Sequence, residues 1–500
     1  MINSVMFLLQ LSGAIGILTN PLILLGIAAG TAVGIVFGAI PGFSATMTII
    51  LLTPVTIPFP PGLALIILIS AYGGAVYGGS IPAILINTPG APGSVVTCWD
   101  GYKLTQQGKA TYALAVSALV SGAAGILAAL MLLLVAPTVA DIALEFGNTE
   151  MFFLSIFALT IIPAAKNASL SKGLLAGTFG LLIATVGSDP LLARPRATFG
   201  LTILRNGLDY IVILIGLFVI TEMIRLGMRG GISDTESDAT GGLEQIKTAI
   251  RACIARPISF LRSTAIGVFV GSLPGAGADV ANFVSYNEAQ RWASENKEKQ
   301  YGSGIIEGVI AADASNNATQ GGALVPTLTL GIPGSGSTAA LLGALAIHGI
   351  NPGPGLFQRS GQIVYAMILS LFIGNILIIM YGIPGSQYFG KFAYIPVQYI
   401  IPAVTILAII GAFAVRNAYF DLFVIIAAGL LGLVFLKYDY PLVSPVLGVI
   451  VGPLAETGFA RGWLLNGGNP IAFATNSLVS VILVALILLS VTITLYQDYR

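Results

Sequence analysis

Residues 31–45 read TAVGIVFGAIPGFSA and residues 264–278 read TAIGVFVGSLPGAGA, with seven of the fifteen positions identical. A second signature follows each of them. It is PAILINTPG at residues 82–90 and PTLTLGIPG at residues 326–334, each a proline, six further residues and then Pro-Gly. Two apolar halves interrupted at matching places are typical of secondary transporters, whose substrate lies between repeated, broken helices. We therefore predict two structural repeats, which we expect to be inverted by analogy with known transporters.

The composition indicates a multi-pass membrane protein. Charged residues make up 9% of the 500 residues and hydrophobic residues 56%, whereas soluble domains have roughly 25% and 45–50%. Apolar runs long enough to span a bilayer recur along the chain, for example at residues 112–135, 208–224, 362–381 and 477–495. We predict an all-α fold with about 10–12 transmembrane helices, some of them broken by Pro-Gly or folded as re-entrant hairpins.

The chain divides into four segments. We assign residues 1–20 to an N-terminal segment that is retained, because it lacks the basic region of a signal peptide. Residues 21–226 form the first transmembrane half, residues 227–262 a polar linker and residues 263–500 the second half. The linker contains GISDTESDATGGLEQ and several arginines, which favours the cytoplasmic side, although Arg194, Arg196 and Arg205 argue for the opposite orientation.

The Pro-Gly breaks are the predicted substrate site. Inside a bilayer, non-helical backbone is tolerated only where it is buried in protein or lines a wet cavity. Proline ends one helix, glycine allows the turn, and the next helix then presents free N–H groups that attract anions. Nearby hydroxyl and amide groups can bind a carboxylate without adding a buried fixed charge. The predicted substrate-binding residues are Pro41, Gly42, Ser44, Asn87, Thr88, Pro89, Gly90, Ser94, Pro274, Gly275, Asn316, Asn317, Pro333, Gly334, Ser335 and Ser337.

Oxygen ligands at the same breaks suit a coupling cation such as Na⁺. The candidates are Thr46, Asp313, Thr329 and Gly331. The alternative reading of all these positions is structural, because glycine, proline and small polar residues also serve close helix packing in membranes. For Asp100 and Lys103 a structural pair or a membrane border is the favoured reading, and we expect the only histidine, His348, to lie at an interface rather than in a proton relay.

Several function classes have no support in the chain. A net charge of +1 excludes a nucleic-acid footprint, and two distant cysteines, Cys98 and Cys253, imply no disulfide framework. The sequence has no zinc motif, Walker A loop or nucleophile elbow. We therefore expect no enzyme, no transition-metal site and no cofactor other than a coupling cation.

Two long runs resemble the large membrane subunit of the tripartite tricarboxylate transporters. They are GGSIPAILINTPGAPGSVVTCWDGYKLTQQGKA at residues 78–110 and the run from GSGIIEGVIAADASNNATQGG to NPGPGLF at residues 302–357. The resemblance implies a bacterial inner-membrane symporter that imports citrate or related small carboxylates with a sodium gradient. Its implied partners are a small four-helix membrane subunit and a periplasmic substrate-binding protein. Asp313 departs from the pattern, which more often has Glu before the Asn pair, and Pro92-Gly93 makes the first-half break stiffer than the family's.

A passive anion channel is the alternative function. Both classes use interrupted helices, but a pore would conduct without a binding protein and without a coupled ion. The breaks at matching places in the two halves favour alternating access.

Overall fold

The structure is a computed structural model that describes residues 2–165, 169–189, 193–229, 242–275, 277–293, 300–389 and 397–499. Within these ranges the regular elements are helices apart from one short antiparallel pair, β1 (Gly187–Ser188) with β2 (Pro195–Arg196). Nine helices of the described part are long and apolar enough to cross a membrane, or ten if the bent pair α12–α13 is one span. The predicted all-α polytopic fold is confirmed.

The first half of the chain forms a compact run of helices around both Pro-Gly breaks. They are α1 (Ile2–Leu18), α2 (Pro21–Gly38), α3 (Ala45–Thr56), α4 (Pro61–Gly78), α5 (Ser80–Ile86), the 3₁₀ turn η1 (Pro92–Ser94), α6 (Val95–Gln106) and α7 (Ala110–Ala143). The breaks separate α2 from α3 and α5 from α6. They fall where the two Pro-Gly signatures predict them.

The second half contains a similar run. It consists of α12 (Leu243–Ile254), α13 (Pro257–Gly271), α14 (Gly277–Arg291), α16 (Ile306–Leu330), α17 (Gly336–Ile347) and α18 (Leu356–Gly385). The breaks here separate α13 from α14 and α16 from α17. The linker predicted at residues 227–262 contains α12, which meets α13 at a bend of 75°; its residues 230–241 lie outside the described residues.

Glycines bring paired helices into close contact in the same way in both runs. A Cβ added at Gly38 of α2 would lie 2.3 Å from the carbonyl oxygen of Ala75 in α4, and one at Gly271 of α13 would lie 2.8 Å from Cα of Thr319 in α16. Small residues allow helix backbones to approach closely where apolar burial gives little driving force. The relation between the two halves, parallel or inverted, stays a prediction.

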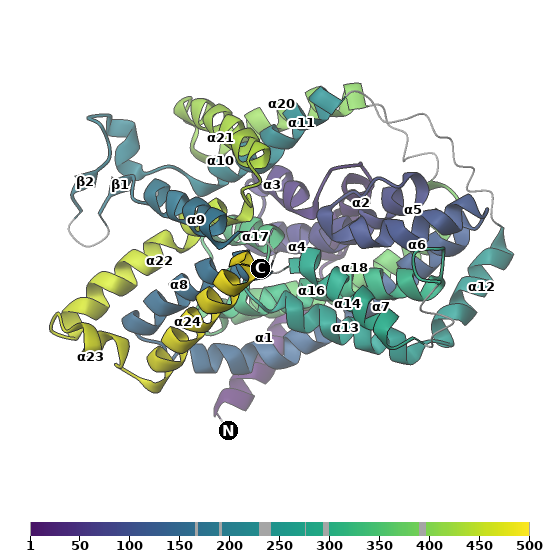
Figure 1. Cartoon of the computed structure of the whole chain (residues 1–500), viewed down its shortest axis with the longest axis horizontal. Coiled ribbons are helices and arrows are strands. Elements are labelled where there is room, and N and C mark those ends of the chain that lie inside the picture. Colours follow the sequence, from purple (N-terminus) through teal and green to yellow (C-terminus); the bar gives the residue numbers. More distant parts are fainter. Residues whose placement is uncertain are drawn as a thin grey trace.

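The remaining helices lie outside these two runs. They are α8 (Asn148–Ala165), α9 (Leu170–Ala184), η2 (Thr202–Asn206), α10 (Tyr210–Leu214), the π-helix η3 (Ile215–Ile220), α11 (Thr221–Arg229), α20 (Val397–Arg416), α21 (Phe420–Lys437), α22 (Val443–Leu465), α23 (Pro470–Ala474) and α24 (Leu478–Tyr499). Figure 1 shows α8, α9, α22, α23 and α24 together on the left and α10, α11, α20 and α21 along the top.

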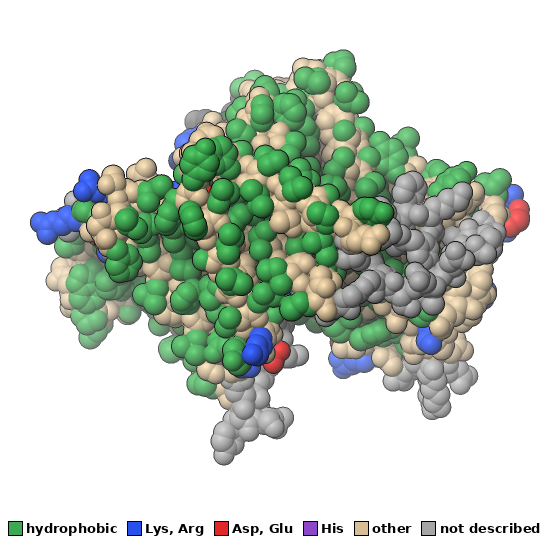
Figure 2. Space-filling model, turned by 90° about the horizontal axis from the view of Figure 1, so that it is seen from above, with side chains coloured by type: hydrophobic (Ala, Val, Ile, Leu, Met, Phe, Trp, Pro, Cys, Tyr) green, Lys and Arg blue, Asp and Glu red, His purple; other side chains and the backbone are tan. Residues whose placement is uncertain are grey.

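Burial separates the central helices from the peripheral ones. The span formed by α4 and α5 has 94% of its apolar window buried, whereas the window in α24 is only 22% buried. Figure 2 shows hydrophobic side chains spread over one face of the molecule, with Lys and Arg gathered near its edges. An apolar surface of this kind suits lipid contact.

Candidate functional site

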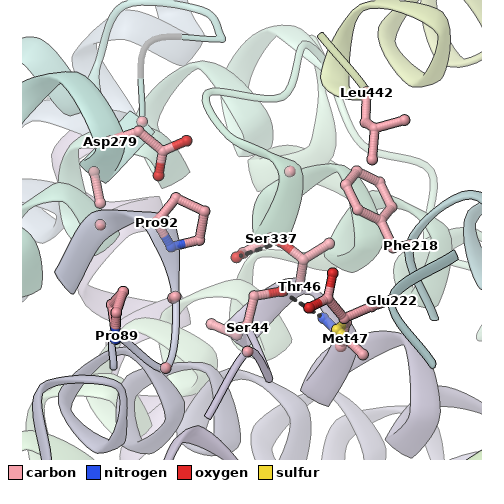
Figure 3. Close-up of a pocket in the computed structure, with 18 of the residues that line it drawn as sticks. Ser44, Thr46, Met47, Pro89, Pro92, Phe218, Glu222, Asp279, Ser337 and Leu442 are labelled. Atoms are coloured by element: carbon pink, nitrogen blue, oxygen red, sulfur yellow. Dashed lines mark hydrogen bonds between the residues drawn. The ribbon is translucent and has the colours of Figure 1, made fainter. Parts of the chain in front are cut away.

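A cavity of about 760 Å³ lies among the broken helices. Its wall includes the first residues of four helices, α3, α6, α14 and α17, each at least 12 residues long. Figure 3 shows residues of the breaks, such as Ser44, Pro89 and Ser337, around one space. The predicted site residues that line it are Pro41, Gly42, Ser44, Thr46, Thr88, Pro89, Gly90, Gly275, Asn316, Ser335 and Ser337.

The turns that follow α2 and α13 each contain a glycine in the left-handed region. Gly42 and Gly275, at equivalent places in the two signatures, have φ of 77° and 75°. Glycine adopts this left-handed region without the steric cost that a side chain brings. After the first turn, Ser44 caps α3 by accepting the N–H of Met47 at 3.3 Å. The first turn also contacts the second break, because the N–H of Gly42 donates to the carbonyl oxygen of Pro89 at 3.3 Å.

The other two breaks begin with the same helix ending. Asn87 ends α5 and Gly331 ends α16, both with left-handed φ, of 56° and 73°. Their N–H groups donate to the carbonyl oxygens of Pro82 and Pro326, the first residues of the two signatures. Asn87 therefore stands where the second half uses glycine, and asparagine is the side chain that best tolerates this conformation. Its side chain is exposed and lies outside the cavity lining.

The last break positions α17 with a capping box. The side chain of Ser335 accepts the N–H of Thr338, and Thr338 Oγ1 accepts the N–H of Ser335 at 2.9 Å. This arrangement fixes the first turn of α17 at the cavity. In that turn Ser337 forms a hydrogen bond of 3.0 Å with Thr46 of α3 (Figure 3).

Other predicted residues lie behind the cavity wall or in the helices beside it. The structure places outside the lining Asn87, Ser94, Pro274, Asp313, Asn317, Thr329, Gly331, Pro333 and Gly334. The Asn pair is split: Asn316 lines the cavity and its amide reaches the carbonyl oxygen of Val76 at 3.4 Å, whereas the fully buried Asn317 has no hydrogen-bond partner among the described residues. Thr329 donates to the carbonyl oxygen of Val325 within its own helix.

Asp313 is buried on α16 beside the same break. Its Oδ1 accepts hydrogen bonds from Ser80 at 2.8 Å and Thr97 at 2.6 Å, so hydroxyls of α5 and α6 both converge on it. Both amide atoms of Asn317, one turn further along α16, are buried without a hydrogen-bond partner in the described part of the chain. Buried polar atoms in this state suggest a place that an ion, a proton or water completes.

Two further carboxylates have structural partners. Asp100 Oδ1 accepts the N–H groups of Gly302, Gly304 and Ile305 at 2.8–3.0 Å, and its Oδ2 accepts the hydroxyl of Tyr286 at 2.7 Å. It therefore ties α6 to the segment that precedes α16. Glu307 forms an ion pair of 2.8 Å with Arg256, and Lys103 donates to Gln106 instead of to Asp100.

His348 follows α17 outside the cavity lining. Its Nε2 lies 3.2 Å from Thr56 Oγ1 at the far end of α3, and burial lowers the pKa of the imidazole below its usual value. The neutral form is therefore favoured at pH 7.

Sequence reasoning missed the charged residues of the cavity. Glu222 and Arg225 of α11 and Asp279 of α14 line it, with Phe218 of the π-helix η3 beside them. Arg225 counts in the sequence only as one of several basic residues at the end of a span, and neither signature includes α11. Proximity of α11 to the breaks arises from tertiary packing alone. The π-helix η3 beside them is a structural feature that often occurs at functional sites, but no residue pattern in the sequence predicts it.

Comparisons with known proteins place the chain in one family. The family model described as the tripartite tricarboxylate transporter TctA family matches residues 24–447. The chain is 36% identical over 477 residues to an uncharacterized 52.8 kDa protein in the TAR-I ttuC' 3' region of Agrobacterium vitis, covering 94% of this chain and 93% of that protein. It is also 33% identical over 217 residues to an uncharacterized protein in the TAR-II ttuC' 3' region of the same organism, covering 43% of this chain and 89% of that protein.

Proposed function

The chain belongs to the tripartite tricarboxylate transporter TctA family, and from that premise we propose that it is the large permease subunit of a secondary transporter that imports tricarboxylates such as citrate or related small carboxylates. Uptake is driven by an ion gradient, with Na⁺ as the coupling cation. The partners are a small four-helix membrane subunit and a periplasmic substrate-binding protein. The complex resides in a bacterial inner membrane.

The convergence of four helix N-termini on one cavity carries this proposal. Each N-terminus carries a partial positive charge, so together they suit a small polyanion, although the N–H groups of Met47, Val95 and Thr338 already donate to Ser44, Pro92 and Ser335. Ser44, Ser335 and Ser337 add hydroxyl donors at the same wall. The substrate carboxylates bind between the Pro-Gly turns of the two halves, with Thr88 and Asn316 as further polar contacts.

Ion coupling is assigned to oxygen atoms beside the same turns. Thr46 lies in the cavity wall and Asp313 lies behind it, where two hydroxyls already point at the carboxylate. Carbonyl oxygens freed at the helix ends near Thr329 and Gly331 complete the set of hard ligands that Na⁺ prefers. A cation bound here would neutralise part of the charge of a tricarboxylate.

The test is uptake of labelled citrate into proteoliposomes that hold the chain with its small subunit. Uptake that requires both a sodium gradient and the cognate binding protein supports the proposal. Flux that proceeds without a gradient and without the binding protein would instead support a passive anion channel.

A further inference from the structure

An ion pair lies in the cavity wall, although the sequence predicts a binding site without a fixed charge. Arg225 Nη2 donates to Glu222 Oε1 at 2.7 Å, one turn apart on α11. Both residues line the cavity, and Arg225 is the only Lys or Arg among its lining residues in the described part of the chain. The side chain of Glu222 is 12% exposed and that of Arg225 35%.

The guanidinium of Arg225 has hydrogen-bonding capacity to spare. Its Nε is buried and has no hydrogen-bond partner among the described residues. A guanidinium presents five donors in a planar fork that matches a carboxylate in two places. One oxygen of Glu222 therefore leaves part of the fork unused.

Glu222 places its carboxylate at the first Pro-Gly turn. A Cβ added at Gly42 would lie 2.9 Å from Glu222 Oε1, and Gly42 is two residues before the N-cap of α3. In Figure 3 Glu222 extends from its helix toward the turn that holds Ser44, on the side of the cavity away from Pro89 and Pro92. A carboxylate is therefore already present between Arg225 and the N-terminus of α3, where the two attract negative charge together.

We propose that Arg225 binds one carboxylate of the substrate, and that Glu222 occupies the guanidinium in the empty carrier until the substrate carboxylate replaces it. The inference rests on the proposed function, because it assigns to the same carboxylate site a residue that recognises the charge of the substrate. The helix N-termini bind one carboxylate and Arg225 binds a second from the wall of α11. Substrates with two or three carboxylates are thereby selected over those with one.

The test measures protection of the purified, full-length chain against thermal unfolding by three acids built on the same five-carbon chain. They are tricarballylate, glutarate and pentanoate, which carry three, two and one carboxylates. Ligand that binds only the folded protein raises the unfolding temperature with its concentration, which gives an apparent Kd. The variants are Arg225→Gln, Arg225→Lys and Glu222→Gln. The matched controls are Arg291→Gln and Glu288→Gln, which alter an ion pair of the same 2.7 Å length and i,i+3 spacing on the exposed side of α14.

In the wild type we expect protection by tricarballylate and glutarate and little by pentanoate. Arg225→Gln weakens binding of the two polycarboxylates roughly 10- to 100-fold, as expected for loss of a charge-assisted hydrogen bond, and removes the difference from pentanoate. Arg225→Lys falls between, because it keeps the charge and loses the fork. Glu222→Gln acts in the opposite direction and tightens binding several-fold, because it removes the competing carboxylate. The control variants leave all three apparent Kd values unchanged.

The opposite changes in apparent Kd expected for Arg225→Gln and Glu222→Gln distinguish substrate recognition from a purely structural ion pair. If Arg225→Gln and Glu222→Gln weaken binding alike, or if Arg225→Gln binds the polycarboxylates as the wild type does, the inference is overturned while the proposed function stands. If no acid protects the wild type, the proposed function fails and the inference with it. Should Arg225→Gln not fold, Arg225→Lys and Glu222→Gln still give the two opposite shifts that decide the question.

Discussion

Thr46 and Ser337 lie in the first turns of α3 and α17, and their hydroxyl oxygens are 3.0 Å apart in the cavity wall. Thr46 follows the first of the four breaks, at Pro41-Gly42, and Ser337 follows the fourth, at Pro333-Gly334. A hydrogen bond between the two halves therefore lies at the site where we place the substrate.

Replacing Thr46 by valine tests this contact, because valine keeps the shape and removes the hydroxyl. We expect the free energy of unfolding to fall by about 1 kcal/mol and the apparent affinity for the transported carboxylate to fall about three- to tenfold. Uptake kinetics and thermal unfolding measure the two effects. The matched control is Thr492→Val, at an exposed threonine in α24, which should change neither quantity. An unchanged KM in Thr46→Val would show that the Thr46 hydroxyl does not contribute to substrate binding.

Gly42→Ala should abolish uptake. Alanine at a φ of 77° costs about 1 kcal/mol in backbone strain, and its Cβ would also approach within 2.9 Å of the Glu222 carboxylate. Gly108→Ala is the control, since Gly108 has a similar φ of 73° and no atom within 4 Å of an added Cβ. Equal uptake by the two variants would show that strain alone, and not the contact at the turn, matters.

Asp313→Asn should remove the dependence of uptake on the ion gradient while the protein still inserts. The substitution keeps the size of the side chain and its place next to Ser80 and Thr97, but it removes the charge. The measurement is initial uptake rate against sodium concentration, and a retained sodium response would contradict the role given to Asp313.

Asp100→Ala should behave differently, because Asp100 holds a loop. Its removal leaves three backbone N–H groups, those of Gly302, Gly304 and Ile305, without their acceptor. Loss of each of these hydrogen bonds costs about 0.5–1.5 kcal/mol, so the unfolding temperature should fall markedly. The sodium response of whatever protein folds should stay that of the wild type; a normal unfolding temperature would contradict the structural role.

His348→Gln should leave the pH profile of uptake unchanged between pH 7 and 8. Burial lowers the pKa of this histidine, so the neutral form already predominates above the usual pKa of about 6.5. We expect the imidazole to become protonated only at lower pH, and the glutamine variant would lack this protonation. Uptake rates at a series of pH values check this. A pH profile that differs from that of the wild type near neutrality would support a role for His348 in a proton relay.

Local chemistry made the breaks predictable. Proline cannot continue a helix and glycine permits the left-handed turn, so both signatures mark helix ends wherever they occur. The matching helix endings at Asn87 and Gly331 were also encoded, since both residues stand five positions after the first proline of their signature. The sequence also predicts that the amide of Asn87 binds substrate, whereas in the structure Asn87 ends α5 and its side chain lies outside the cavity lining.

Tertiary packing decided the rest. Asn316 and Asn317 are neighbours on α16, and successive residues of a helix point about 100° apart, so only one of them can face the cavity. The sequence does not show which one. Glu222 and Arg225 lie far from either signature along the chain, and they reach the cavity because α11 packs beside the first turn.

The central claim, that a small carboxylate occupies the cavity between the breaks, is tested most directly by labelling a cysteine placed in it. Thr88→Cys, a half-buried lining residue, is made in a chain whose Cys98 and Cys253 are replaced by serine, and Ser303→Cys on the exposed loop is the control. The account predicts that citrate or another small polycarboxylate, added with Na⁺, slows reaction of the Thr88→Cys thiol with a maleimide and leaves the Ser303→Cys rate unchanged. Equal rates at Thr88→Cys with and without every tri- and dicarboxylate tried would contradict it.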